Sequence, residues 1–247
     1  MKITFLGSSH GIAEKNRYCS SIVVTVNGKH YVIDAGAPIL DLLQRNGFAF
    51  EDVNGIFITH MHSDHMIGLY AFMDTLNDFN EFSHIKIPVY APDLKRLNAM
   101  VSLIETCIPY HGRMTLNKYE EGVVFDDGNV KISSVKTQHI ENSHAFIVEA
   151  DGKKVVFTGD LTCNLTDYPK IFNDYNNECD LVIMESAHQF YSEDYVYDTL
   201  SKTKTKAMVL NHVYELRNSL EILTDFASKI QSKFPLTVAY DGMIIEL

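Results

Sequence analysis

Residues 57–69 read FITHMHSDHMIGL, a stretch that places His60, His62, Asp64 and His65 within six positions, directly after an apolar run. Four titratable side chains so close together are poor material for a core, because a buried polar group without a partner costs free energy. They are equally unusual for a solvent loop. A shared metal ion would satisfy all of them, so we expect this stretch to bind metal.

The chain on both sides of this stretch alternates apolar runs with helical patterns, which is typical of α/β proteins. Asn27-Gly28 lies between two β-branched runs and predicts a hairpin over 22–33. Two further hairpins are expected over 144–160 and, at the end of the chain, over 236–247. Other strands are expected over 2–7, 53–60, 85–92, 129–139, 179–186 and 206–213, a loop around 107–114, and helices over 39–43, 64–76, 93–106, 192–202 and 217–231.

Composition and length narrow the class of protein. The chain has 247 residues, 46% of them hydrophobic, and no linker composition, so we expect a single domain over 1–247. A net charge of -11 argues against a nucleic-acid polymer held by a broad basic surface, although a local basic groove stays open. The four cysteines lack CxxC spacing, and no apolar run is long enough for a signal peptide or a membrane span. We therefore expect a cytoplasmic protein without a membrane partner.

Apolar runs in four parts of the chain end in side chains that can bind metal. Ile58-Thr59 leads to His60, Thr137-Gln138 to His139, Thr158-Gly159 to Asp160, and Leu210-Asn211 to His212. Binding sites in α/β proteins form where strand ends converge on one edge. We therefore expect one site assembled from these distant segments.

The number of candidate ligands indicates two metal ions. They are His60, His62, Asp64, His65, His139, Asp160 and His212. Seven ligands exceed what one tetrahedral ion uses, and histidine with carboxylate suits Zn²⁺, with Mn²⁺ or Fe²⁺ as alternatives. Two ions roughly 3.5 Å apart, bridged by a carboxylate, can share a hydroxide for hydrolysis.

Asp64 is expected to have a second role, and the histidines outside the ligand set are expected in several different places. Asp64 lies between the histidine pairs, so we expect it to accept a hydrogen bond from the hydroxide as well as to bind metal. His144 is the rival of His139 as a ligand. His10, His84 and His111 are expected on the surface or in a substrate cleft, and His30 is expected to face solvent beside the hairpin turn.

The motif THMHSDHMIGL at 59–69 resembles the HxHxDH signature of the metallo-β-lactamase superfamily. YVIDAG at 31–36, FTGD at 157–160 and VLNH at 209–212 resemble its other motifs, in the expected order. The resemblance implies a four-layer αββα sandwich with two mixed β-sheets and outer helices. It also implies that His60, His62 and His139 hold one metal and Asp64, His65 and His212 the other, with Asp160 between them and Asp34 orienting the ligands.

Within the superfamily, residues 6–24 and 139–149 resemble the tRNase Z and cyclic phosphodiesterase branch, and the second of these segments selects His139 over His144. DLVIMESAH at 180–188 resembles a strand of that branch. His62 stands where the flavodiiron branch carries glutamate, which favours zinc. True β-lactamases are typically secreted, and glyoxalase II proteins usually carry a C-terminal substrate domain, so neither of these branches matches this chain.

Two departures count against tRNase Z itself. Only one hairpin separates His139 from Asp160, where that enzyme carries a long tRNA-gripping arm, and the HST motif expected between Glu185 and His212 is missing. We therefore expect a zinc-dependent phosphodiesterase that acts on a small phosphodiester. A carboxylic ester, thioester or lactone hydrolase, a tRNA 3′-processing endonuclease without the usual arm, and a non-catalytic metal-binding regulator remain as alternatives. A homodimer is left open.

Overall fold

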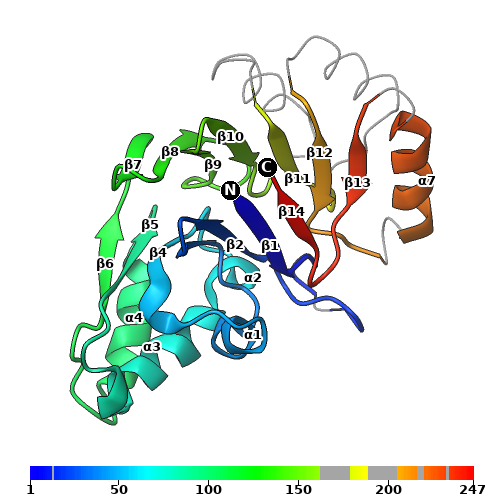
Figure 1. Cartoon of the computed structure of the whole chain (residues 1–247). Coiled ribbons are helices and arrows are strands. Elements are labelled where there is room, and N and C mark those ends of the chain that lie inside the picture. Colours follow the sequence, from blue (N-terminus) through cyan, green and yellow to red (C-terminus); the bar gives the residue numbers. More distant parts are fainter. Residues whose placement is uncertain (13, 162–178, 189–204, 216–219, 232–233) are drawn as a thin grey trace.

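The computed structural model describes residues 1–12, 14–161, 179–188, 205–215, 220–231 and 234–247. Two seven-stranded sheets form the centre of the molecule, in the orders β14-β1-β2-β3-β4-β5-β6 and β13-β12-β11-β10-β9-β8-β7 (Figure 1). The first sheet contains β1 (Lys2–Gly7), β2 (Ser21–Val26), β3 (Lys29–Ile33), β4 (Val53–Phe57), β5 (Ile87–Ala91), β6 (Met114–Lys118) and β14 (Ile244–Glu246). The second contains β7 (Gly122–Asp126), β8 (Lys131–Lys136), β9 (His144–Ala150), β10 (Lys153–Phe157), β11 (Leu181–Glu185), β12 (Met208–Asn211) and β13 (Leu236–Val238).

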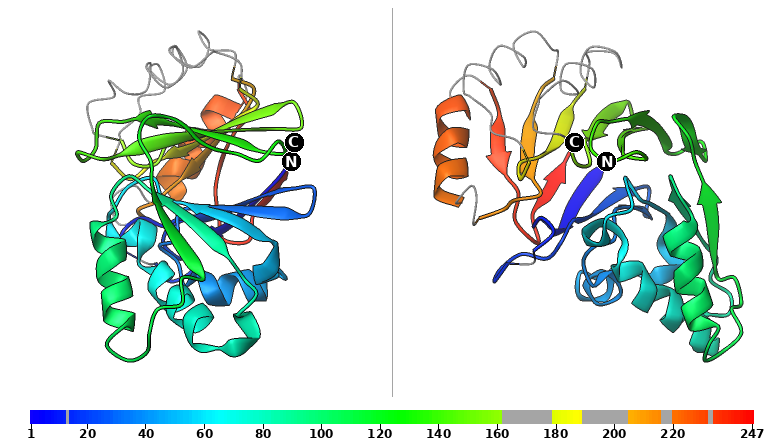
Figure 2. Two further views of the ribbon diagram at one scale, coloured as in Figure 1. Left: turned by 90° about the vertical axis from the view of Figure 1, so that its left-hand side faces the viewer. Right: turned by 180° about the vertical axis from the view of Figure 1, so that it is seen from behind.

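Helices cover the outer face of each sheet (Figure 2). The first sheet carries α1 (Ile39–Arg45), α2 (Ser63–Met66), α3 (Gly68–Asp78) and α4 (Lys95–Ile104), with the short 3₁₀ turns η1 (Phe50–Asp52) and η2 (Asn80–Phe82). The second sheet carries α7 (Leu220–Gln231). Both sheets are mixed, because each joins antiparallel strands on one side to parallel strands on the other. The predicted αββα fold is therefore confirmed.

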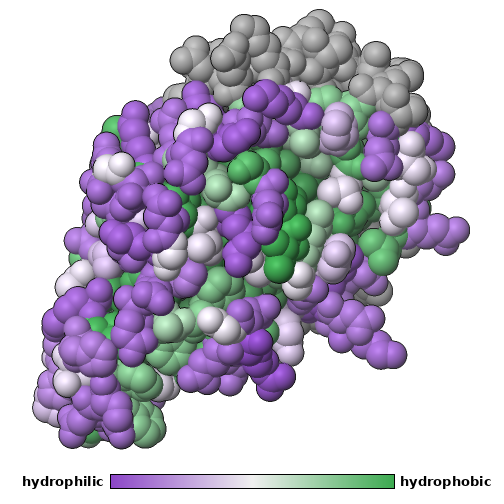
Figure 3. All heavy atoms as spheres, viewed as in Figure 1, coloured by the Kyte–Doolittle hydropathy of each residue, from purple (hydrophilic) through white to green (hydrophobic). Residues whose placement is uncertain are grey.

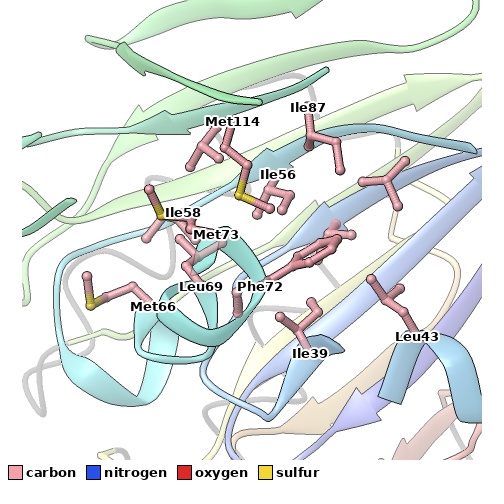
Figure 4. Close-up of a cluster of buried hydrophobic side chains, with 14 of the residues drawn as sticks. Ile39, Leu43, Ile56, Ile58, Met66, Leu69, Phe72, Met73, Ile87 and Met114 are labelled. Carbon is pink, nitrogen blue, oxygen red and sulfur yellow. The ribbon is translucent and has the colours of Figure 1, made fainter. Parts of the chain in front are cut away.

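Three apolar cores separate the four layers. One lies under α1, α3 and α4, where Leu69, Phe72 and Met73 pack on Ile56 and Ile87 (Figure 4). A second lies between the sheets, and a third lies under α7. Because side chains alternate between the two faces of a strand, each buried strand supplies two cores at once. This double burial explains why the strands read as continuous apolar runs.

Two of the predicted hairpins are present. Asn27 and Gly28 have φ angles of 51° and 78° between β2 and β3, and Asp151 and Gly152 have 53° and 70° between β9 and β10. Positive φ at both central residues is the geometry of the tight turn whose twist matches paired strands. Only the turn Asp151-Gly152 separates β9 from β10, so no longer arm extends from between these two strands.

The third predicted hairpin, over 236–247, is wrong. β13 pairs in parallel with β12 in the second sheet, whereas β14 pairs antiparallel with β1 in the first. Asp241 lies in the connection between them, and its carboxylate accepts hydrogen bonds from the backbone N–H groups of Ser8 and Tyr18 at 2.9 and 2.6 Å. Two apolar runs beside a turn predict strands, but they do not identify the partners of those strands.

The region between α4 and β8 contains two strands that the sequence did not indicate. β6 and β7 are the outermost strands of their sheets, and they contribute few buried side chains. β6 (MTLNK) has no continuous apolar run, whereas β7 (GVVFD) contains the short run 123–125, which was not recognised as a strand. The helix expected over 192–202 lies outside the described residues, and the single domain over 1–247 stays a prediction.

The surface in the view of Figure 3 is mostly hydrophilic, with apolar atoms gathered in a strip over β14. Ile244 of that strand is 56% exposed. None of the described helices combines the length and the apolar composition that crossing a bilayer requires.

Candidate metal centre

The ends of strands from both sheets meet at one edge of the sandwich. β4 leads into His60, β10 into Asp160 and β12 into His212. Gly159 makes this meeting possible, because a Cβ there would lie 2.9 Å from the carbonyl oxygen of His144 and 3.0 Å from the Cβ of Thr59. A side chain at position 159 would therefore push the two strand ends apart.

The seven candidate ligands form two clusters that share one residue. The clusters are His60, His62, His139 and Asp160, and Asp64, His65, Asp160 and His212. Within each cluster the possible ligand atoms lie within 4.8 Å of one another. The structure thus brings together all seven residues that were predicted to bind metal, although their role in binding metal stays a prediction.

Asp160 turns one carboxylate oxygen to each cluster. Its Oδ2 lies 3.7 Å from Nε2 of His60 and 3.4 Å from Nε2 of His139. Its Oδ1 lies 3.2 Å from Nε2 of His65 and 3.3 Å from Nε2 of His212. A carboxylate placed in this way can bridge two cations.

Several of these atoms are buried without a directed hydrogen bond. Nε2 of His65, Nε2 of His212 and Oδ1 of Asp160 have no hydrogen-bond partner within the part of the chain that the structure describes. Leaving such groups unsatisfied costs about 1–3 kcal/mol each. Three unsatisfied atoms that point at one another, all of them good ligands for a divalent ion, fit a bound metal.

Asp34 lies behind the candidate ligands and contacts one of them directly. It has a φ of 60° and accepts a hydrogen bond from the N–H of Thr59 at 2.8 Å. Its Oδ2 lies 2.7 Å from Nδ1 of His65, and the hydroxyl of Thr59 lies 3.1 Å from Nδ1 of His60. These contacts hold the Nδ1 proton of each ring, so that Nε2 is left as a ligand.

Burial and the neighbouring carboxylates shift the pKa values of the clustered histidines in different directions. Burial disfavours a charged ring, but Asp160 and Asp34 raise the pKa of His65 well above its ordinary value. Burial lowers the pKa of His139 to about 4 and that of His60 well below its usual range. A metal ion bound at Nε2 of His65 would have to displace the proton that this raised pKa favours.

Sequence reasoning did not assign roles to Glu185 and His188. The Glu185 carboxylate accepts hydrogen bonds from the N–H groups of Ala187 and His188 at 2.9 and 3.0 Å. Nδ1 of His188 lies 3.7 Å from Oδ2 of Asp160, and its ring is close to the rings of His139 and His212. The end of β11 at Glu185 was the available signal, because the other strand ends had already been assigned to the site.

The other histidines differ in their environments. His84 and His111 are exposed, as expected, and His144 is buried outside both clusters. The expectation that His30 faces solvent is wrong, because it is only 9% exposed. Its ring packs edge-on against Phe48, and its Nδ1 lies 3.0 Å from the hydroxyl of Thr25.

Comparison with known proteins identifies relatives of this chain in sequence and in fold. The chain is 33% identical over 152 residues to a ribonuclease Z of Archaeoglobus fulgidus, an alignment that covers 61% of this chain and 48% of that one. The matched segment therefore spans about half the length of this curated relative. Two solved structures share the fold over 100% of this chain and 99% of theirs: human tRNase Z, short form, with a TM-score of 0.74 and 20% identity, and the metallo-β-lactamase fold protein YhfI of Bacillus subtilis, with a TM-score of 0.78 and 16% identity.

A family model described as anti-Pycsar protein Apyc1 matches residues 1–232, which is nearly the whole chain. The match includes all seven residues of the two clusters and both sheets except β13 and β14. With its two mixed sheets, its paired clusters and this match, the chain belongs to the anti-Pycsar Apyc1 family of metallo-β-lactamase fold proteins.

Proposed function

We propose that this chain is a hydrolase with a dinuclear metal site that cleaves small phosphodiesters. The observation that carries the proposal is the position of Asp160, which offers one oxygen to each of two ligand clusters. Sites with two metal ions serve hydrolytic displacement at phosphorus, where both the attacking and the leaving oxygen need stabilisation.

The proposed ligands divide between the two ions. His60, His62 and His139 would hold one ion, Asp64, His65 and His212 the other, and Asp160 would serve both. Nitrogen and oxygen donors in this proportion, without thiolates, favour Zn²⁺. The two ions would supply a nucleophile from water near neutral pH and positive charge beside the phosphoryl group.

Asp64 has a second role in this proposal. Its Oδ2 lies 3.4 Å from Nε2 of His65 and 3.8 Å from Nε2 of His212. Burial opposes ionisation, but His65 and His212 lower the pKa of the Asp64 carboxyl group below its usual range. The ionised carboxylate can accept a hydrogen bond from the attacking water and so orient it toward phosphorus.

The size of the substrate follows from the surroundings of the site. The hairpin of β9 and β10 leaves no chain between them for a long arm, and the net charge of -11 opposes a polyanion. A small diester such as a cyclic nucleotide meets neither obstacle. The similarity to a ribonuclease Z makes precursor tRNA the competing substrate that a test must include.

The proposal is tested with zinc-loaded protein against a panel of substrates. Bis-p-nitrophenyl phosphate, cyclic nucleotides, a phosphomonoester, a thioester, a lactone and precursor tRNA are assayed on one preparation, with elemental analysis of the same sample. We expect two metal equivalents and turnover of the small diesters. One equivalent at saturation would refute the dinuclear site, and preferred turnover of a thioester or lactone would refute the reaction class.

A further inference from the structure

The loop after β1 packs directly against the second cluster. The backbone N–H of His10 donates to the carbonyl of Val213 at 3.1 Å, which fixes the loop beside His212. A Cβ on Gly11 would come within 3.3 Å of Oδ2 of Asp64. The loop therefore forms one wall of the site, and His10 is the titratable residue at its centre.

The ring of His10 is held in place by its neighbours. It stacks on the ring of Tyr214, with centroids 4.0 Å apart and planes within 4°. Its centroid lies 5.6 Å from that of His212 and 6.1 Å from that of His188. Two faces of the site thus converge on an imidazole whose orientation is already determined before a substrate binds.

A backbone hydrogen bond determines which nitrogen of His10 carries the proton. The N–H of Ile12 points at Nδ1 at 3.2 Å. A backbone amide can only donate, so Nδ1 must be the acceptor and Nε2 must carry the hydrogen. In an imidazole ring Nε2 is farther from the main chain than Nδ1, so the donor lies at the tip of the side chain.

The hydrogen bond from Ile12 fixes the charge of the ring as well as its tautomer. A ring that accepts a hydrogen bond at Nδ1 carries a single proton and no net charge. It can therefore donate one hydrogen bond from Nε2 without adding charge to the site.

We propose that His10 binds the substrate by donating the Nε2 hydrogen to a phosphoryl oxygen at the Asp64, His65 and His212 side of the site. This inference rests on the proposed function and adds a substrate-binding residue to it. Charge on the phosphoryl oxygens is greatest in the transition state, so a preoriented donor stabilises that state more than the bound substrate. Removing a donor of this kind from other enzymes costs on the order of 10²–10³-fold in turnover.

Three substitutions at position 10 separate hydrogen bonding from packing. His10→Phe keeps a ring on Tyr214 and removes both nitrogens. His10→Asn keeps an acceptor near the position of Nδ1 and removes the Nε2 donor, whereas His10→Gln can place an amide N–H near the position of Nε2. We expect kcat/KM for small diesters to fall about 10²-fold in the Phe and Asn variants and about tenfold in the Gln variant.

His84→Phe is the matched control, because His84 is an exposed histidine whose side chain contacts Glu51 rather than the site. It should leave kcat/KM and metal content unchanged. Metal content should also stay at two equivalents in all three position 10 variants. Activity of His10→Phe within about twofold of the wild type would overturn the proposal, as would equal losses in the Asn and Gln variants.

Two measurements are independent of turnover and separate this inference from the proposed function. Nitrogen-15 NMR of the imidazole rings should show His10 protonated at Nε2, and a proton on Nδ1 would overturn the argument. Calorimetric titration of the zinc-loaded protein with inorganic phosphate should show binding that weakens about tenfold in His10→Phe. Wild-type protein that binds no phosphate, or equal binding by the variant, would refute the role of His10, whereas failure of every diester assay would refute the proposed function alone.

Discussion

Changing Asp34 to asparagine should weaken one of the two metal sites and spare the other. Oδ1 of Asp34 accepts from the N–H of Thr59, so the amide oxygen of asparagine must take that position. The amide nitrogen then faces Nδ1 of His65, where Oδ2 now lies at 2.7 Å. Two donors would oppose each other unless the ring moves its proton to Nε2, the atom that the metal needs.

The size of the effect follows from this tautomer change. Loss of a carboxylate behind a ligating histidine costs about 10–100-fold in metal affinity, or about 1.4–2.8 kcal/mol. His60 should be spared, because the Thr59 hydroxyl can still donate to the amide oxygen and still contact Nδ1 of His60. We therefore expect the loss only for the ion held by Asp64, His65 and His212.

Competition with a zinc chelator measures both affinities in one titration. The wild type should release its two ions with affinities that the chelator resolves, and Asp34→Asn should release one of them at a 10–100-fold lower chelator concentration. Asp41→Asn makes the same charge change on the exposed face of α1 and serves as the control. Equal loss of both ions, or no loss, would refute the assignment of Asp34 to His65.

Three further outcomes test the site in other ways. Asp64→Asn should lower kcat by at least ~10²-fold, because the attacking water loses its acceptor, and normal turnover with full metal would show that no carboxylate is needed. Zinc affinity should rise with pH, because the raised pKa of His65 means that a proton must leave this ring when metal binds. Calorimetry in buffers of different ionisation enthalpy should detect the released proton. Zinc binding without proton release would contradict this prediction. Precursor tRNA should be cleaved more slowly than bis-p-nitrophenyl phosphate. Its cleavage should slow further as the salt concentration is lowered, because the net charge of -11 is then screened less. Efficient cleavage of tRNA without turnover of small diesters would show that an unrecognised surface binds tRNA.

The sequence was informative about the site because the ligands have a fixed local spacing. His60, His62, Asp64 and His65 follow one strand, and they adopt their positions through the start of one short helix, α2. His139, Asp160 and His212 follow other buried strands, so the rule that strand ends converge was enough to group them. The α/β class was accessible because strands buried on both faces leave long apolar runs, whereas the four-layer sandwich was implied by the resemblance to a known superfamily.

Pairing between distant strands could not be read in this way. The last two strands were expected to form a hairpin, yet β13 and β14 lie in different sheets. The connection between them is tied to the start of the chain by backbone hydrogen bonds to Asp241, which join residues more than 200 positions apart. The edge strand β6 escaped prediction because its residues form no apolar run, and the short apolar run of β7, residues 123–125, was not recognised as a strand.

The sequence by itself therefore determined the seven candidate ligands, the α/β class and the short interval between His139 and Asp160, and its resemblance to a known superfamily added the αββα arrangement. Only the tertiary structure decided that the seven side chains come together in two clusters, that each oxygen of Asp160 faces a different cluster, and that His10 and His188 lie beside them. The physical reason is the distance over which each kind of constraint acts. Spacing along a chain constrains neighbours within one strand or turn, whereas the distance between side chains on separate loops is set by how the sheets pack and which backbone groups bond across them.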